Sequence, residues 1–270
     1  MNKNKNIRLI FYIFFLLCLF FILAPLLAPH DPMRTHATMT CEPPSGQHLF
    51  GTDELGRDIL SRMLFGGRTT LLIGLIATSL SCFIGTALGL ISGYYGGKTD
   101  ILISQVMNLA LAFPSLLLAI GISVVLPAGF LSVVIALSIA GWADFGRLIR
   151  GQTLTLKNRE FITAATVLGS SSGKIIVRHI LPNCIPLLIV SFSMKLGTFM
   201  LAESGLSFLG LGIPPPYPTL GGMISSGRDM LITCPWIPLL PGFLISIMVL
   251  VFNLLGEMLQ SVSDPKRKKS

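Results

Sequence analysis

The sequence predicts an all-α integral membrane protein with six transmembrane helices, and three observations lead to this fold class. Of its 270 residues, 52% are hydrophobic and only 12% are charged. Soluble domains carry about a quarter charged residues, so a globule of this size would lack the polar surface that it needs to dissolve. The mean hydropathy is +0.76, and the apolar residues gather in long uncharged stretches. This composition excludes a soluble enzyme, a disordered chain and a disulfide-stapled secreted module.

The uncharged stretches place the spans, because about 18 or more apolar residues are needed for a helix to cross a bilayer. The stretch from Ile101 to Ala143 is too long for one crossing, and the turn sequence Pro127-Ala128-Gly129 divides it in two. The first stretch is longer than the apolar region of a signal peptide and lacks a cleavage site, so we expect a retained anchor. The six predicted spans are about 9–28, 69–92, 101–126, 130–149, 184–210 and 239–258.

The basic residues indicate the orientation, because cytoplasmic loops carry an excess of Lys and Arg. With both termini in the cytoplasm, fourteen of the 20 basic residues lie inside and five outside, while Lys195 lies within a span. The reverse orientation would place fourteen basic residues outside. The net charge of +8 is therefore a topology signal, and nucleic-acid binding is not needed to explain it.

Three loops are long enough to carry a function. In the external segment of about 29–68, apolar residues from Leu55 to Leu64 recur near helical spacing, which predicts a short helix in the interface plane before the second span. The cytoplasmic loop of about 150–183 reads as a helix, a glycine turn, a second short helix and a proline. The loop of about 211–238 begins with several prolines, so it is either an external cap or a re-entrant segment.

Possible metal ligands and cysteines are irregularly spaced. The five Cys argue against a disulfide framework or a zinc cluster, and whether Cys41 pairs with Cys234 stays open. Ligand types without a fixed spacing are weak evidence for a metal site, so we expect an incidental polar loop and no metal. These candidate ligands are His30, Asp31, Met33, His36, Met39, Cys41 and His48.

Two charged residues, Lys195 and Glu203, fall inside the fifth predicted span. A charge near the middle of a bilayer costs about 2.5–3.5 kcal/mol on insertion scales, so each side chain should face protein or a water-filled path. Lining the translocation path and pairing with a partner subunit are equally open for both. Near the inner end of the fourth span, Asp144 and Arg147 are three residues apart and are expected to neutralise each other.

Glycines suggest one packing face and one false motif. Gly85, Gly89, Gly93 and Gly97 recur every four residues, which favours close contact between helices. The segment from Ser92 to Thr99 looks like a phosphate-binding loop, but it follows a membrane span instead of a β-strand, so we expect a short cytoplasmic turn.

Several motifs, in order along nearly the whole chain, together resemble one family. The cytoplasmic loop, with Thr163-Ala164-Ala165, Gly169 and Leu181-Pro182, looks like the coupling loop of ATP-binding-cassette importer permeases. The other motifs resemble the second permease of dipeptide, oligopeptide and nickel importers. They are Gly51-Thr52-Asp53-x-x-Gly56-Arg57-Asp58, Gly93-Tyr94-Tyr95-Gly96-Gly97 with Asp100, Ser207-Phe208-Leu209-Gly210-Leu211-Gly212 and Phe252-Asn253-Leu254-Leu255-Gly256.

The resemblance implies a type I importer permease fold and a bacterial plasma-membrane location. It divides the chain into an anchor helix with an external segment (1–68), a permease domain (69–258) and a basic cytoplasmic tail (259–270). The expected partners are membrane lipid, a second permease in a heterodimer, an external solute-binding protein and two ATPases, which would bind ATP and Mg²⁺. This chain itself would hold no cofactor and catalyse no reaction. The residues implied in coupling to an ATPase are Thr163, Ala164, Ala165, Gly169, Leu181 and Pro182.

The chain departs from the family pattern at a few positions. Thr163 stands where the general motif has Glu, His179 where it has Ile, and Glu257 where Asp is usual; Thr219-Leu220 replaces a frequent Glu-Trp. The solute stays open between small peptides and a nickel or other metal chelate. The competing function is a secondary transporter or channel, which works without an ATPase and usually carries its own coupling charges and internal repeats. A membrane enzyme is disfavoured, because no nucleophile and base stand at motif spacing.

Overall fold

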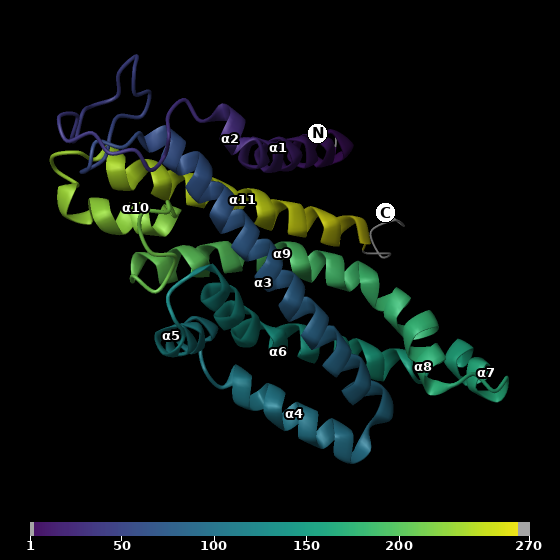
Figure 1. The fold of residues 1–270 in the computed structure, drawn as a ribbon. Coiled ribbons are helices and arrows are strands. Elements are labelled where there is room, and N and C mark those ends of the chain that lie inside the picture. Colours follow the sequence, from purple (N-terminus) through teal and green to yellow (C-terminus); the bar gives the residue numbers. More distant parts are fainter. Residues whose placement is uncertain (1–2, 264–270) are drawn as a thin grey trace.

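The computed structural model describes residues 3–263, and every regular element in that range is a helix apart from one isolated β-bridge between Thr52 and Asp58. The basic tail of 264–270 lies outside the described residues. The helices, shown in Figure 1, are α1 (Lys3–Ile22), α2 (Ala24–Leu27), α3 (Ile59–Tyr95), α4 (Gly97–Leu111), α5 (Ser115–Val125), α6 (Phe130–Leu156), α7 (Glu160–Val167), α8 (Ser172–Ile175), α9 (Leu181–Phe208), α10 (Leu220–Gly227) and α11 (Trp236–Ser263).

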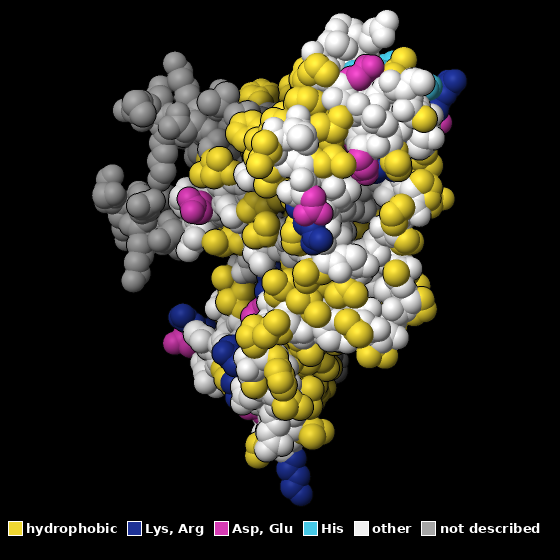
Figure 2. All heavy atoms as spheres, turned by 90° about the vertical axis from the view of Figure 1, so that its left-hand side faces the viewer, with side chains coloured by type: hydrophobic (Ala, Val, Ile, Leu, Met, Phe, Trp, Pro, Cys, Tyr) yellow, Lys and Arg dark blue, Asp and Glu magenta, His cyan; other side chains and the backbone are white. Residues whose placement is uncertain are grey.

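Four of the helices in the described part of the chain are long and apolar enough to cross a membrane, or five if α4 and α5 form one bent span. The four are α3, α6, the run from Ser172 to Phe208, and α11. Hydrophobic side chains cover much of the face turned to the viewer in Figure 2, with only small separate groups of charged side chains between them. Phe83 on α3 and Val125 on α5 are 75% and 83% exposed. Such outward apolar surfaces are suited to lipid or to neighbouring helices.

The break between α4 and α5 differs from the single straight span expected over 101–126. The two helices meet at an angle of 87°. The bend falls at Pro114, which has no backbone N–H for a helical hydrogen bond and disfavours helical geometry in the residue before it. The expected division at Pro127 to Gly129 is confirmed, since α5 ends at Val125 and α6 begins at Phe130.

The short helix expected from Leu55 is a wrong prediction. Leu55 lies in a turn, and helix α3 begins at Ile59 and continues without a break to Tyr95. The start is fixed by Asp58, whose carboxylate accepts a hydrogen bond from the Ser61 N–H at 2.8 Å. The apolar spacing that suggested a separate helix is the first part of the long one.

Helices α3 and α6 run parallel and pack closely along the glycines. A Cβ added at Gly85, Gly89 or Gly93 would lie only 2.3, 2.6 or 2.7 Å from the nearest atom of α6. The predicted packing face is therefore confirmed at these three positions. Gly97 differs, because a Cβ there would meet nothing within 4 Å; its φ of +54° instead belongs to the turn between α3 and α4. The Ser92–Thr99 segment accordingly runs from the last turn of α3 into the first turn of α4, so a helix precedes it instead of a β-strand.

Of the other long helices, α9 runs antiparallel to α3 and α6, and α11 runs parallel to them. Helix α9 is antiparallel to α3, since Glu203 contacts Thr70 while Gly74 faces Leu196 and Met200. Helix α11 is antiparallel to α9, since Gly197 faces Val249 and Phe252 whereas Gly256 faces Met194. Helices α3, α6 and α11 thus point one way and α9 the other.

Figure 1 shows irregular segments gathered at the two ends of the helices. One end, which we call the loop end, carries residues 28–58 and helix α10, and there a disulfide joins Cys41 to Cys234 across 193 residues of sequence. Trp236 Nε1 also donates a hydrogen bond to the Thr52 carbonyl at 3.2 Å. The opposite end, the projection end, carries α7 and α8. Three buried apolar clusters fill the interior between the two ends.

Candidate functional site

The segment of residues 157–180 forms a compact helical projection beyond the end of α6. Helix α7 follows a three-residue connection, and after a turn at Gly169 come α8 and a π-helical turn, Ile176–Ile180, that leads into α9. The expected order of helix, glycine turn, short helix and proline is confirmed. Ile162 on α7 is 3% exposed and packs in one cluster with Ile175 and Ile180. The projection is therefore a folded element with its own buried contacts.

Gly169 ends helix α7 by a specific backbone arrangement. Its φ is +77°, its N–H donates to the Thr166 carbonyl, and the next N–H, of Ser170, donates to the Ala165 carbonyl. These two bonds make a Schellman motif, in which the left-handed residue is usually Gly because a side chain is strained there. A Cβ at Gly169 would meet nothing within 4 Å, so the requirement for Gly is conformational and the surface around it is open.

The residues expected to couple to an ATPase lie on both sides of the projection. Thr163, Ala164 and Gly169 are exposed, whereas Ala165 is 7% exposed and packs inside the projection. Leu181 and Pro182 form the first turn of α9, directly after the π-helical turn. Ala165 thus supports the projection from within, and the exposed residues form its outer face.

A shallow apolar groove of about 510 Å³ follows the outer face of α7. Only Thr163 and Ala164 of its six lining residues were predicted from the sequence; the most exposed apolar ones that were missed are Val167 and Leu168, at 81% and 85%. Their signal was an apolar pair immediately before the helix-ending Gly169, at positions where a solvent-facing helix end is normally polar. The residues that line the groove are Asn158, Glu160, Thr163, Ala164, Val167 and Leu168.

The projection is joined to the membrane part by one helical run. Residues Ser172 to Phe208 form a continuous helix of 37 residues. Pro182 and Pro186 lie within it, and the π-helical turn just before Pro182 accommodates the missing backbone donor. Helix α8 and helix α9, which carries Lys195 and Glu203, therefore belong to one helical run.

Lys195 lies between α9 and α6 and pairs with Asp144. Its Nζ also lies 5.5 Å from the centre of the Phe199 ring, within the range of a cation–π contact. The expected pairing of Asp144 with Arg147 is wrong, because Arg147 instead donates to the Asn108 side chain at 3.4 Å. The side chain of Lys195 is 18% exposed, so its charge is satisfied inside this chain.

Glu203 is fully buried between α9 and α3. Its carboxyl group accepts hydrogen bonds from Thr70 Oγ1 at 2.6 Å and from Ser207 Oγ at 2.8 Å, and Ser204 Oγ lies 3.4 Å away. No basic side chain of the described residues pairs with it. Hydroxyl donors thus replace a counter-ion, and the one from Thr70 connects α9 to α3 at this level.

A pocket of about 540 Å³ opens at the loop end, above Glu203. Its walls come from three places: residues 54–62, the turn after α9 and helix α10. Ser207, which donates to Glu203, lines this pocket and connects the two. Arg57 and Arg62 in the wall are both held by Asp53, at 2.7 and 3.3 Å. The pocket is therefore lined by fixed charges as well as apolar groups.

The motif from Gly51 to Asp58 contributes one wall of this loop-end pocket, through Glu54, Leu55 and Arg57. Asp53 accepts hydrogen bonds from the N–H groups of Leu55 and Arg57, both at 2.9 Å, which closes a tight turn. Gly56 has a φ of +72°, and a Cβ there would lie 2.0 Å from the His36 carbonyl, so only Gly fits. The motif predicted the family from sequence, and its local role is to hold Arg57 in place.

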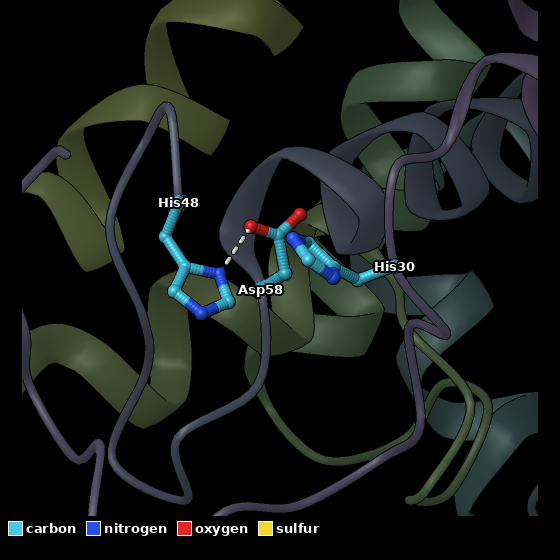
Figure 3. A group of neighbouring side chains, drawn as sticks. All are labelled: His30, His48 and Asp58. Atoms are coloured by element: carbon cyan, nitrogen blue, oxygen red, sulfur yellow. Dashed lines mark hydrogen bonds and ion pairs between the residues drawn. The ribbon is translucent and has the colours of Figure 1, made fainter. Parts of the chain in front are cut away.

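Histidines of the 30–48 segment gather at the beginning of α3. His30, His48 and Asp58 each offer a ligand atom, and these atoms all lie within 4.8 Å of one another. Figure 3 shows the Asp58 carboxylate between the two imidazole rings. The other candidates named from sequence, among them His36 and Met39, are not part of this group.

Comparison with known proteins places the chain in a transport family. Residues 85–269 match the family described as "Binding-protein-dependent transport system inner membrane component". The chain is 42% identical over 267 residues to the dipeptide transport system permease protein DppC of Alkalihalophilus pseudofirmus, which covers 99% of this chain and 87% of the relative. It is 38% identical over 268 residues to the oligopeptide transport system permease protein OppC of Bacillus subtilis, with 99% and 87% covered.

Solved structures share the fold at lower identity. An inward-facing structure of the MetNI methionine ABC transporter has a chain that matches with a TM-score of 0.62 and 17% identity, covering 76% of this chain and 98% of that one. The arrangement of helices is thus that of an importer permease, and the sequence match extends over nearly the whole length. The chain therefore belongs to the family of binding-protein-dependent transport system inner membrane components.

Proposed function

We propose that this chain is a non-catalytic permease subunit of an ATP-driven importer and forms half of the translocation path for small peptides. The family supports the importer class. Relatives that carry dipeptide, oligopeptide and glutathione transport in their names support a peptide solute over a nickel chelate. ATP and Mg²⁺ are held by partner ATPases, and this chain takes no part in ATP hydrolysis.

The directions of the helices support six spans with both termini in the cytoplasm of a bacterium. Helices α3 and α6 are parallel, so the chain must return across the membrane between them, and the bent pair α4–α5 makes that crossing. Helix α1 runs towards the loop end, because Phe14 contacts Phe252 in the second half of α11 whereas Phe21 contacts Gly67 near the loop-end start of α3. It is therefore antiparallel to α3 and α11, which both start at the loop end. The loop end then faces outward. Helix α10, with eight residues, is too short to span and caps the outer surface.

The projection of residues 157–180, with Leu181 and Pro182 at its junction with α9, serves as the docking element for an ATPase. Thr163, Ala164, Val167 and Leu168 present an apolar groove to that partner, Ala165 supports the groove from within, and Gly169 sets its end. Leu181 and Pro182 connect it to α9. A second permease completes a heterodimer, two ATPases bind on the cytoplasmic side, and an external solute-binding protein delivers peptide to the loop-end pocket.

The observation that carries this proposal is the unbroken helix from the docking element to the buried centre. Ser172 to Phe208 is one helical run, so closure of the ATPases moves α9 together with Lys195 and Glu203. These two residues are our candidates for the translocation path. Packed helices have discrete alternative arrangements, and breaking or keeping the Glu203–Thr70 contact would distinguish two of them.

The test is peptide uptake by the complete importer in proteoliposomes with ATP inside. Val167→Glu introduces a charge into the groove, whereas Ser171→Glu places the same charge on an exposed residue outside it. We expect the first variant to lose ATPase co-purification and at least tenfold of its uptake rate, and the second to retain both. Normal uptake by Val167→Glu would contradict the docking role. Uptake by vesicles without ATPases would instead support a secondary transporter or channel.

A further inference from the structure

A second group of side chains lies at the loop end, at the beginning of α3 and beside the wall of the loop-end pocket. His30 comes from the connection after α2, His48 from the middle of the following segment and Asp58 from the N-terminus of α3. Two imidazoles and one carboxylate from different parts of the loop end thus lie together, as Figure 3 shows. Imidazole with carboxylate is a ligand set typical of divalent transition metals, whereas Ca²⁺ and Mg²⁺ prefer oxygen ligands alone.

The three side chains are positioned by contacts of their own. His48 Nδ1 lies 2.9 Å from Asp58 Oδ1, and both residues are buried. The other carboxylate oxygen, Oδ2, accepts from the Ser61 N–H. His30 Nε2 lies 3.0 Å from the Gln47 carbonyl, and the His30 backbone N–H donates to Ser61 Oγ at 3.1 Å. Such outer contacts orient metal ligands and tune their basicity.

From this geometry we propose that His30, His48 and Asp58 bind one divalent transition-metal ion, of the Zn²⁺ class, which fastens the external segment to the beginning of α3. Bonds of about 2.1 Å to a tetrahedral ion separate two ligands by about 3.4 Å. The pair of His48 and Asp58, at 2.9 Å, needs only a small adjustment. The remaining separations, at most 4.8 Å, close by rotation of the exposed His30 ring.

Binding of the ion replaces a hydrogen bond and leaves an open position. Coordination through His48 Nδ1 requires that this nitrogen carry no hydrogen, so the ring binds as the Nε2–H tautomer and its contact with Asp58 Oδ1 gives way to two metal bonds. His30 is exposed while its two partners are buried, so the ion enters from the solvent side. A water molecule completes the coordination there, as in sites with three protein ligands.

The experiment measures metal binding by the tag-free full chain in lipid nanodiscs. Co²⁺ serves as the probe, since its visible absorption reports coordination, and Zn²⁺ is then added to displace it. We expect one Co²⁺ per chain, displacement by Zn²⁺ and no displacement by a large excess of Mg²⁺. His30→Gln removes the exposed ligand and should weaken binding at least tenfold. Asp58→Asn should do the same while it keeps a side chain that can cap α3.

The matched control is His36→Gln, which removes a histidine of the same segment that lies outside the cluster. It should bind Co²⁺ as the unchanged chain does. An absence of saturable binding, equal losses in His36→Gln and His30→Gln, or displacement by Mg²⁺ would overturn the proposal. The His48–Asp58 contact would then be only a hydrogen-bonded support for the helix start. Melting curves of each variant without metal show that it is folded.

Discussion

The glycine contact between α3 and α6 leads to a prediction about a single methyl group. Gly89→Ala places a Cβ 2.6 Å from the Gly146 carbonyl oxygen and 3.0 Å from the Arg150 nitrogen, whereas ordinary contact begins at 3.4 Å. The two backbones must therefore separate locally by about 0.8 Å. Overpacking of this kind costs about 1–3 kcal/mol. The higher helix propensity of Ala returns about 1 kcal/mol, so the net loss of stability should be at most about 2 kcal/mol.

The control is Gly121→Ala on α5, where a Cβ meets nothing within 4 Å. It gains the same propensity without the steric cost, so the difference between the two variants isolates that cost. Titration with a denaturing detergent in mixed micelles, followed by the fluorescence of Trp142 and Trp236, gives the free energy of unfolding. Gly89→Ala should unfold about 1–3 kcal/mol more easily than Gly121→Ala. Equal stabilities would refute the account of the glycine face.

Three further predictions concern single contacts. Reduction, or Cys41→Ser with Cys234→Ser, should destabilise the chain by about 2–4 kcal/mol, and a reductant should lower the melting temperature of the unchanged chain but not of the double variant. Lys195→Met and Asp144→Asn should each cost about 1 kcal/mol, and a double-mutant cycle should recover part of the loss; strict additivity would show that the pair contributes nothing. Gly169→Ala should cost about 1–2 kcal/mol from its φ of +77°, seen as faster hydrogen exchange at the end of α7, and unchanged exchange would contradict this.

The sequence could predict elements whose signal lies in consecutive residues. Long, predominantly apolar stretches placed α3, α6, α9 and α11, because a helix needs about 18 or more mostly apolar residues to cross a bilayer. The same signal does not show a bend. The stretch around Pro114 is uniformly apolar, so its division into α4 and α5 was missed although the proline was present.

Contacts between residues that are far apart in the chain could not be predicted from the sequence. Spacing alone suggested that Asp144 pairs with Arg147, but packing places α9 beside α6 and gives the carboxylate to Lys195. His30 and His48 have no regular spacing in the sequence. In the structure they lie together beside Asp58, which caps the N-terminus of α3. The coupling residues were recognisable by resemblance, whereas the inward position of Ala165 depends on the fold of the projection.

The continuous helix from Ser172 to Phe208 has a thermodynamic consequence for the coupling between solute binding and ATPase binding. If binding of an ATPase to the projection shifts this helix, a solute that binds more tightly to one position of the helix must change the affinity for the ATPase by the same factor. The reason is that coupling free energies are reciprocal. Solute bound near Glu203 would thereby change the affinity for an ATPase about 50 Å away, a distance that follows from the helical rise of about 1.5 Å per residue. This helix alone would connect the solute site with the ATPase site.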